Sequence, residues 1–173
     1  RIDHDDDEFL FQLFRSANEH KFDTLSWPEE RLSHLLRTQF EAQEQQYRGR
    51  YANAELHIVM AGDVPAGRFY VWRGADEIVL IDITIASEYR NRQIGSTLVG
   101  RLLAEGRREG KTVRAHVESS NRARRLWGRL GFQVVEDLGI YLRLEQPAIA
   151  IADVDRQVVL DLASGPGGSS WLT

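Results

Sequence analysis

Residues 81–99 read IDITIASEYRNRQIGSTLV, and this stretch decides the fold. It opens as an Ile-rich strand, passes through a turn that holds Arg90 and Arg92, and enters a helix near Gly95. The first amides of a helix lack intrahelical partners, and the helix dipole adds positive potential, so this place suits phosphate oxygens. The two arginines add charge-assisted hydrogen bonds. The stretch therefore predicts a strand, a turn and a helix around an anion-binding site.

The remaining sequence supplies elements on both sides of this unit. Apolar residues at helical spacing, with Ser26 as a capping residue and Glu29 three positions later, predict two helices before the strands. Runs of β-branched and aromatic residues predict an antiparallel meander and a later hairpin. The predicted elements are helices over 5–22 and 26–48, strands over 55–60, 67–72 and 77–85, a helix over 94–108, a strand over 112–118, a helix over 121–130, and a hairpin over 132–135 and 140–144. This order, ααβββαβαββ, indicates an α/β protein of the α+β type.

Composition excludes several classes of protein. The chain has 173 residues, of which 42% are hydrophobic and 28% charged, which is typical of one globular domain and not of a disordered tail. It has no cysteine, so cysteine catalysis, zinc fingers and iron–sulfur clusters are excluded. Its five histidines lack metal-ligand spacing, and we expect no metal. Because a chain without cysteine needs no oxidising compartment, we expect a cytoplasmic location. No apolar run reaches about 18 residues, so we expect no membrane partner.

Charge is distributed unevenly along the chain. Residues 88–130 hold eleven basic and four acidic side chains, a net charge of +7, although the whole chain carries −4 and the remainder therefore −11. A local positive field on an acidic protein indicates a polyanionic ligand bound at one place, and it argues against a nucleic acid partner. The alternative is a solvated basic face.

Three motifs together resemble one family. They are RNRQIG at 90–95, TVRAHVES at 112–119 and NRARRLWGRLGF at 121–132. With the order of elements, they resemble the GNAT superfamily of acyl-CoA N-acyltransferases, whose signature is [RQ]-x-x-G-x-[GA]. The resemblance implies a GNAT domain over 1–146, with a mixed, mostly antiparallel central sheet and helices on both faces. It also implies transfer of an acetyl group from acetyl-CoA, as cosubstrate, to a primary amine in a ternary complex.

The resemblance also implies which residues hold coenzyme A. Backbone groups of the strand would lie beside the pantetheine arm and acyl carbonyl, and amides of the turn would hold the pyrophosphate. Ser120 or Asn121 would contact pantetheine, and Arg124 would meet the 3′-phosphate, with a solvated helix face as the alternative for Arg124. The implied residues are Ile83, Thr84, Ile85, Arg90, Asn91, Arg92, Gln93, Ile94, Gly95, Ser96, Ser120, Asn121, Arg124 and Trp127.

Two positions depart from the family pattern. Gln93 replaces the usual Gly, which is tolerable where the backbone is helical. Trp127 stands where many members carry a Tyr that protonates the departing thiolate, and an indole N–H is no general acid. We therefore consider Tyr89, Tyr141 and Ser120 as replacements. A thiol of pKa about 8.5 also leaves tolerably well unprotonated.

The amine must lose a proton before it attacks, so the reaction needs a base. Strand alternation places Asp82 on one face with Ile78, Leu80 and Thr84, where a carboxylate needs a partner or a function. Glu118 ends the next strand, near where neighbouring strands are expected to splay around the acyl group. We consider Asp82 and Glu118 as bases, and His116 below them. Proton loss through a water chain and an ion pair with Arg114 are the alternatives.

Other readings of the sequence stay open. The chain can be a non-catalytic acyl-CoA binding or sensing module, which Trp127 favours. The acceptor amine, on a small molecule or a peptide, cannot be identified. Residues 147–173 form a C-terminal extension that we expect to add a strand to the sheet, within the chain or across a homodimer, with an irregular extension as the alternative.

Overall fold

A computed structural model describes residues 6–119 and 124–148. Six strands form one sheet in the order β1-β2-β3-β4-β6-β5, and the only parallel pair among the described strands is β3 with β4. This mixed, mostly antiparallel sheet confirms the predicted fold class. The strand bounds are β1 Glu55–Ala61, β2 Val64–Arg73, β3 Glu77–Ile85, β4 Thr112–Glu118, β5 Gln133–Asp137 and β6 Tyr141–Gln146.

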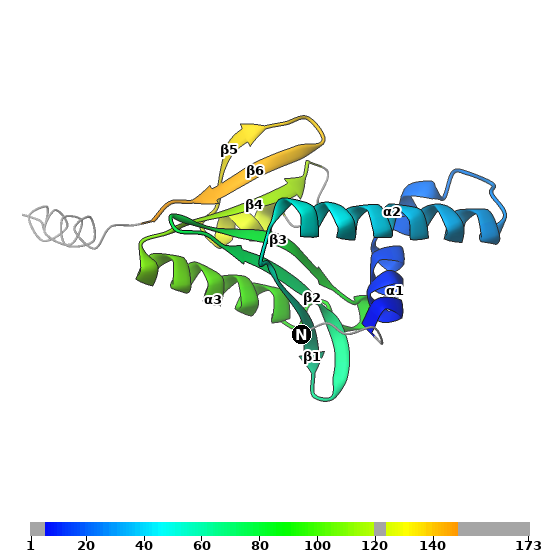
Figure 1. Cartoon of the computed structure of the whole chain (residues 1–173), viewed down its shortest axis with the longest axis horizontal. Helices are drawn as coiled ribbons and strands as arrows, with labels where there is room; N and C mark the ends of the chain where they lie inside the picture. Colours follow the sequence, from blue (N-terminus) through cyan, green and yellow to red (C-terminus); the bar gives the residue numbers. More distant parts are fainter. Residues whose placement is uncertain (1–5, 120–123, 149–173) are drawn as a thin grey trace, which may run out of the picture.

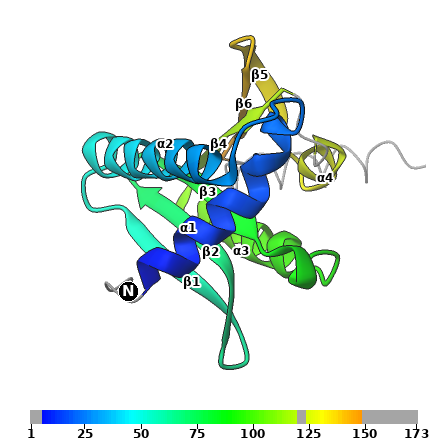
Figure 2. The ribbon, with the colours of Figure 1, turned by 90° about the vertical axis from the view of Figure 1, so that its right-hand side faces the viewer.

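Helices cover both faces of the sheet (Figure 1). On one face lie α1 (Asp6–Asn18), the 3₁₀ turn η1 (Glu19–Phe22) and α2 (Glu29–Arg50). On the other face lie α3 (Ile94–Glu109) and the short α4 (Arg124–Arg129), and Figure 2 shows α3 and α1 on opposite sides of the strands. Among the described residues, no helix is both long and apolar enough to cross a bilayer.

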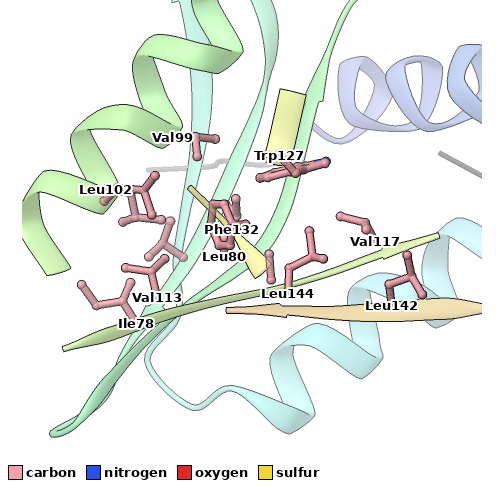
Figure 3. Packing of buried hydrophobic residues seen from close by; sticks show 13 residues of the cluster. Ile78, Leu80, Val99, Leu102, Val113, Val117, Trp127, Phe132, Leu142 and Leu144 are labelled. Atoms are coloured by element: carbon pink, nitrogen blue, oxygen red, sulfur yellow. The ribbon is translucent and has the colours of Figure 1, made fainter. Parts of the chain in front are cut away.

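Two apolar cores hold these layers together. The core under α1 and α2 joins Leu10, Phe11 and Leu36 to Tyr70 of β2. The core under α3 and α4 joins Val99 and Leu102 to strand residues of β3, β4 and β6 (Figure 3). Each helix therefore buries one apolar stripe against the sheet, as its helical spacing predicts. α3 ends at Gly110, whose φ of 66° suits the left-handed cap predicted for it.

The start of α2 differs from the prediction. Pro28 is the N-cap, with no side-chain cap hydrogen bond, so the expected cap by Ser26 is wrong. The Pro28 carbonyl instead accepts the backbone N–H groups of Arg31 and Leu32, at 3.0 and 3.1 Å. A proline with φ of −59° already has a helical φ and needs no donor at this position, which is the physical reason that it starts the helix.

A β-bulge in β3 changes which side chains face the helices. Tyr70 of β2 pairs with Asp82 and Val71 pairs with Leu80, so Ile81 has no partner in β2. Leu80 packs in the core under α3, whereas Ile81 packs in the core under α1 and α2. The extra residue reverses the alternation, so Asp82 lies on the α2 face with Thr84 and not with Leu80. The predicted face of Asp82 relative to Ile78 and Leu80 is therefore wrong.

The parallel pair β3–β4 separates partway along. Its register runs from Glu77 opposite Thr112 to Leu80 opposite Ala115, although β3 continues to Ile85 and β4 to Glu118. β4 stays paired with β6 as far as Glu118 opposite Tyr141. The sheet therefore opens between β3 and β4 just beyond the bulge, where the sequence predicted a splay.

Candidate active site

A cavity of about 1000 Å³ occupies this opening. Its lining comes from both faces of the sheet, because Phe14 and Tyr47 belong to α1 and α2 whereas Trp127 belongs to α4. Ala115 and Val117 also line it, and both belong to the core under α3. The cavity thus continues from one face of the sheet to the other through the gap between β3 and β4.

The Arg-rich turn leads from β3 into α3 on one side of this cavity. Gln93, the N-cap of α3, has φ of 61° and ψ of 6°, and Asn91 also has φ of 61°. Both residues are left-handed, so the helical backbone that would make a side chain at Gln93 tolerable is not present, and Gln93 occupies a conformation that favours Gly. The first hydrogen bond of α3 runs from the Thr97 N–H to the Gln93 carbonyl at 2.9 Å, so the helical pattern leaves the amides of Ile94, Gly95 and Ser96 without intrahelical acceptors.

The two arginines of the turn make different contacts. Arg90 lines the cavity, and its Nε donates to the Ile85 carbonyl at 2.9 Å, which ties the turn to the end of β3. The guanidinium of Arg92 lies 5.2 Å from the centre of the Tyr89 ring. Both arginines are exposed and carry positive charge to the start of α3.

The start of α3 packs directly on the end of β3. A Cβ placed on Gly95 would lie 3.8 Å from Cδ1 of Ile83 and 3.9 Å from Cγ1 of Ile85. The free amides of α3 and the unpaired edge of β3 from Ile81 to Ile85 are therefore neighbours. Together they offer an anion site followed by a strand edge that can pair with an extended ligand.

Arg68 organises the opposite wall of the cavity. Its side chain is 3% exposed, and its guanidinium contacts Asp82 Oδ2 at 2.6 Å and Glu44 Oε1 at 3.0 Å. Tyr47 donates its hydroxyl to Asp82 Oδ2 at 3.1 Å, and Thr84 donates to Oδ1 at 2.9 Å. Burial raises the pKa of the Glu44 carboxyl. Burial, with the neighbouring charge of Asp82, also raises the pKa of Tyr47, so this phenol keeps its proton and remains a donor.

Glu118 lies across the cavity from Asp82, at the end of β4. Its Oε1 contacts Nζ of Lys21, a residue of η1, at 2.6 Å. Arg114, the predicted alternative partner for this strand's charged face, instead pairs with Glu77 at 2.8 Å and Glu145 at 3.0 Å. Glu118 is therefore held by a residue 97 positions away in the chain.

His116 shares the cavity face of β4 with Glu118. The alternation predicted for β4 is confirmed, because Val113, Ala115 and Val117 are buried on the other face. His116 lines the cavity and has no hydrogen-bond partner in the described part of the chain. Burial, and then the positive charges of Arg50, Arg114 and Arg143, lower the pKa of its imidazole, which favours the neutral form.

A family model for the acetyltransferase (GNAT) family matches residues 11–132. The chain belongs to this family. The fold is also that of solved GNAT structures. PaiA N-acetyltransferase from Thermoplasma acidophilum, in complex with coenzyme A, aligns with a TM-score of 0.63 and 17% identity over 84% of this chain and 95% of that one. An acetyltransferase from Thermus thermophilus aligns with a TM-score of 0.61 and 20% identity over 84% and 93%.

A third solved structure is more distant. The ribosomal-protein-S18-alanine N-acetyltransferase from Escherichia coli aligns with a TM-score of 0.52 and 19% identity, over 62% of this chain and 78% of that one. No curated protein sequence matches significantly. Membership of the GNAT family makes the chain an acyltransferase that uses coenzyme A thioesters.

Of the two tyrosines considered as the general acid, one lines the cavity and the other does not. Tyr141 lines it and is 47% exposed, whereas Tyr89 is not among the lining residues and stacks with Arg92. Trp127 lines the cavity, is 7% exposed and packs edge-on against Phe132, with ring centres 5.4 Å apart (Figure 3). Its indole Nε1 is buried and has no hydrogen-bond partner among the described residues.

Some residues that the resemblance assigns to coenzyme A lie in the part of the chain that the structure does not describe. Ser120 and Asn121 lie outside the described residues, as does the side chain of Arg124, so their roles remain predictions. Within the described ranges, no group of three or more His, Asp or Glu residues could hold a metal ion.

Sequence reasoning missed Lys21 and Arg68. Arg68 had a usable signal, because a lone charge within the apolar run GRFYVW at 67–72 requires a buried partner. No signal in the sequence pointed to Lys21, because only the tertiary structure brings η1 to the end of β4.

Proposed function

We propose that this GNAT protein transfers the acetyl group of acetyl-CoA to a primary amine by direct attack in a ternary complex. The observation that carries the proposal is the cavity through the sheet. It is lined by Arg90, from the turn that leads into α3, and by two carboxylates, Asp82 and Glu118. A thioester from one face and an amine from the other can thus meet between β3 and β4.

Residues of the described structure fit coenzyme A. The amides of Ile94, Gly95 and Ser96 would hold pyrophosphate oxygens, with the charges of Arg90 and Arg92 nearby. The free edge of β3 at Ile83–Ile85 would pair with the amide groups of the pantetheine arm. Trp127 and Val117 would surround the thioester end with apolar surface.

Glu118 is the base that the geometry favours. It lines the cavity, and Lys21 holds only one of its oxygens, so the other can take the proton of an incoming ammonium. Asp82 accepts hydrogen bonds from Arg68, Tyr47 and Thr84, which leaves less room for a proton donor. His116, whose lowered pKa favours the neutral imidazole and which has no hydrogen-bond partner among the described residues, is the next candidate. The amine then attacks the carbonyl carbon and the carbon–sulfur bond breaks.

No buried phenol stands at Trp127 to protonate the sulfur. The leaving group, a thiol of pKa about 8.5, can depart as the thiolate. Tyr141 remains the acid candidate that lines the cavity. The acceptor, on a small molecule or a peptide, the cytoplasmic location, the domain limit at residue 146 and a homodimer all stay predictions.

The test is the release of free thiol from acetyl-CoA with a panel of primary amines. We expect Glu118→Gln to lower kcat by about 10²–10⁴, the usual effect of losing a general base. Glu109→Gln is the matched control, because Glu109 also pairs with a lysine, Lys111 at 3.1 Å, but lies outside the cavity. Equal turnover in the two variants would remove Glu118 from the mechanism, and the same assay on His116→Gln and Asp82→Asn would then assign the base.

A non-catalytic acyl-CoA binding module is the second candidate. The observation that favours it is the buried indole at Trp127, which cannot act as an acid. Acetyl-CoA would then raise the melting temperature, while no amine of the panel released thiol.

A further inference from the structure

Lysine is rare in this protein, and one lysine lies in the cavity. The 22 basic residues comprise twenty arginines and only two lysines, Lys21 and Lys111. Lys21 lines the cavity, whereas Lys111 lies at the far end of α3, just after its cap, and is not a lining residue. Of the two side-chain primary amines among the described residues, one therefore lies in the cavity and the other lies outside it.

The lysine in the cavity is held where an acceptor amine is needed. Nζ of Lys21 lies 2.6 Å from Oε1 of Glu118, the carboxylate proposed as the base, and the two residues are 97 positions apart in the chain. The Lys21 side chain is 39% exposed, so the ion pair is not sealed in the core. An ammonium group hydrogen-bonded to a base at the wall of an acyl-transfer cavity has the arrangement that an acceptor must adopt.

We propose that Lys21 is a self-acylation site of this protein. The inference rests on the proposed acyl transfer. Glu118 takes a proton from the Lys21 ammonium, and the resulting amine attacks the thioester carbonyl. A carbon–nitrogen bond forms, the carbon–sulfur bond breaks, coenzyme A leaves as the thiolate, and the second amine proton passes to solvent. Glu118 then releases the proton it took to solvent and is again a carboxylate. The product is an amide at Lys21 and free coenzyme A.

Acylation changes the charge of the cavity. The amide at Lys21 is neutral and can no longer pair with Glu118, so the ion pair between η1 and β4 is lost. Glu118 is then a free carboxylate at the wall that lies under α1 and α2. Self-acylation would therefore free the Glu118 oxygen that Lys21 holds, so that both oxygens of this carboxylate could accept a proton from an incoming ammonium.

The experiment is peptide mass mapping of the full chain after incubation with acetyl-CoA. Lys111 is the internal control, since it also pairs with a glutamate, and an acetyl N-hydroxysuccinimide ester measures how accessible each lysine is to a simple reagent. With acetyl-CoA, we expect the ratio of Lys21 to Lys111 acylation to exceed the ratio found with the ester by at least about tenfold. The Lys21 rate per molecule should not change on dilution, because the reaction occurs within one chain.

Two variants and the amine panel distinguish failure of self-acylation from failure of the proposed acyltransferase activity. Glu118→Gln should slow Lys21 acylation at least about tenfold and leave Lys111 unchanged, and Lys21→Arg should keep the ion pair without any acylation at that position. Equal ratios for acetyl-CoA and the ester would overturn the proposal. If amines of the panel release thiol while Lys21 stays unmodified, self-acylation is wrong and the acyltransferase proposal stands. If acetyl-CoA neither stabilises the protein nor acylates anything, both are wrong.

Discussion

Arg68 is the residue on which the wall of the cavity depends. It lies on β2 beneath α2, and its guanidinium contacts two carboxylates and the side-chain oxygen of Gln43, at 2.8 Å. Buried charges are tolerated only where each has a partner, so the removal of Arg68 would deprive Glu44 and Asp82 of the cation that contacts both of them. The geometry of Asp82, and through it that of Tyr47, follows from this one side chain.

We expect Arg68→Met to lower the free energy of unfolding by about 3–5 kcal/mol, because it strands two buried carboxylates. Urea unfolding at neutral pH measures this loss. Arg108→Met is the control, since Arg108 pairs with Glu109 on the surface and should change stability by less than about 0.5 kcal/mol. A loss below about 1 kcal/mol for Arg68→Met would mean that the carboxylates find water or another partner.

At the scale of elements, α3 links the anion site to the core. Its start carries the free amides, and its last turns pack on β4, where Gly106 approaches the buried Val113. A Cβ on Gly106 would lie 2.5 Å from Cγ2 of Val113 and 3.0 Å from the Lys111 carbonyl, so this glycine permits the close contact of helix and strand. Gly100 of the same helix has open space at the same position.

These two glycines of α3 make a matched pair. Gly100→Ala should stabilise the protein by about 0.5–1 kcal/mol, because alanine is the better helix former and nothing obstructs its Cβ. Gly106→Ala should destabilise it by about 1–3 kcal/mol, because the helix must move away from Val113. Thermal or urea unfolding of both variants measures the difference. Equal effects would show that α3 does not rest on β4 at this point.

At the scale of the whole molecule, arginines from three different elements act on His116 of β4. Arg50 of α2, Arg114 of β4 and Arg143 of β6 all act against protonation of the imidazole, while Glu136 of β5 favours it. The pKa of His116 is therefore lower in the folded protein than its ordinary 6.5. The unfolded chain binds this proton more readily than the folded one.

The stability of the protein therefore depends on pH through His116. The contribution of His116 to stability is fully present above its unfolded pKa, near 6.5, and is lost as the pH falls toward its lower folded value. We expect His116→Gln to flatten this part of the stability curve, as measured by urea unfolding between about pH 7.5 and pH 5. His34→Gln, at an exposed position of α2, is the control substitution. An equally steep acid loss in His116→Gln would assign the effect to other groups.

Much of this molecule could be predicted from local sequence. The order of elements, the alternation of β4 and the cap of α3 at Gly110 depend on residues a few positions apart, and all are confirmed. The Arg-rich turn before α3 was also recognisable, because its chemistry lies within ten residues. What local spacing could not show was the left-handed backbone at Gln93, since the start of α3 must also fit against Ile83 and Ile85.

Only the tertiary structure decided how the site is assembled. The bulge at Ile81 depends on the register between β2 and β3, and one extra residue moves Asp82 to the face of α2 and gives it Arg68 as a partner. The pair of Lys21 and Glu118 depends on the packing of η1 over the end of β4. Periodicity along one segment specifies which face is apolar. Pairing between segments distant in sequence is set by the packing of the whole chain, and that packing placed the charges around the cavity.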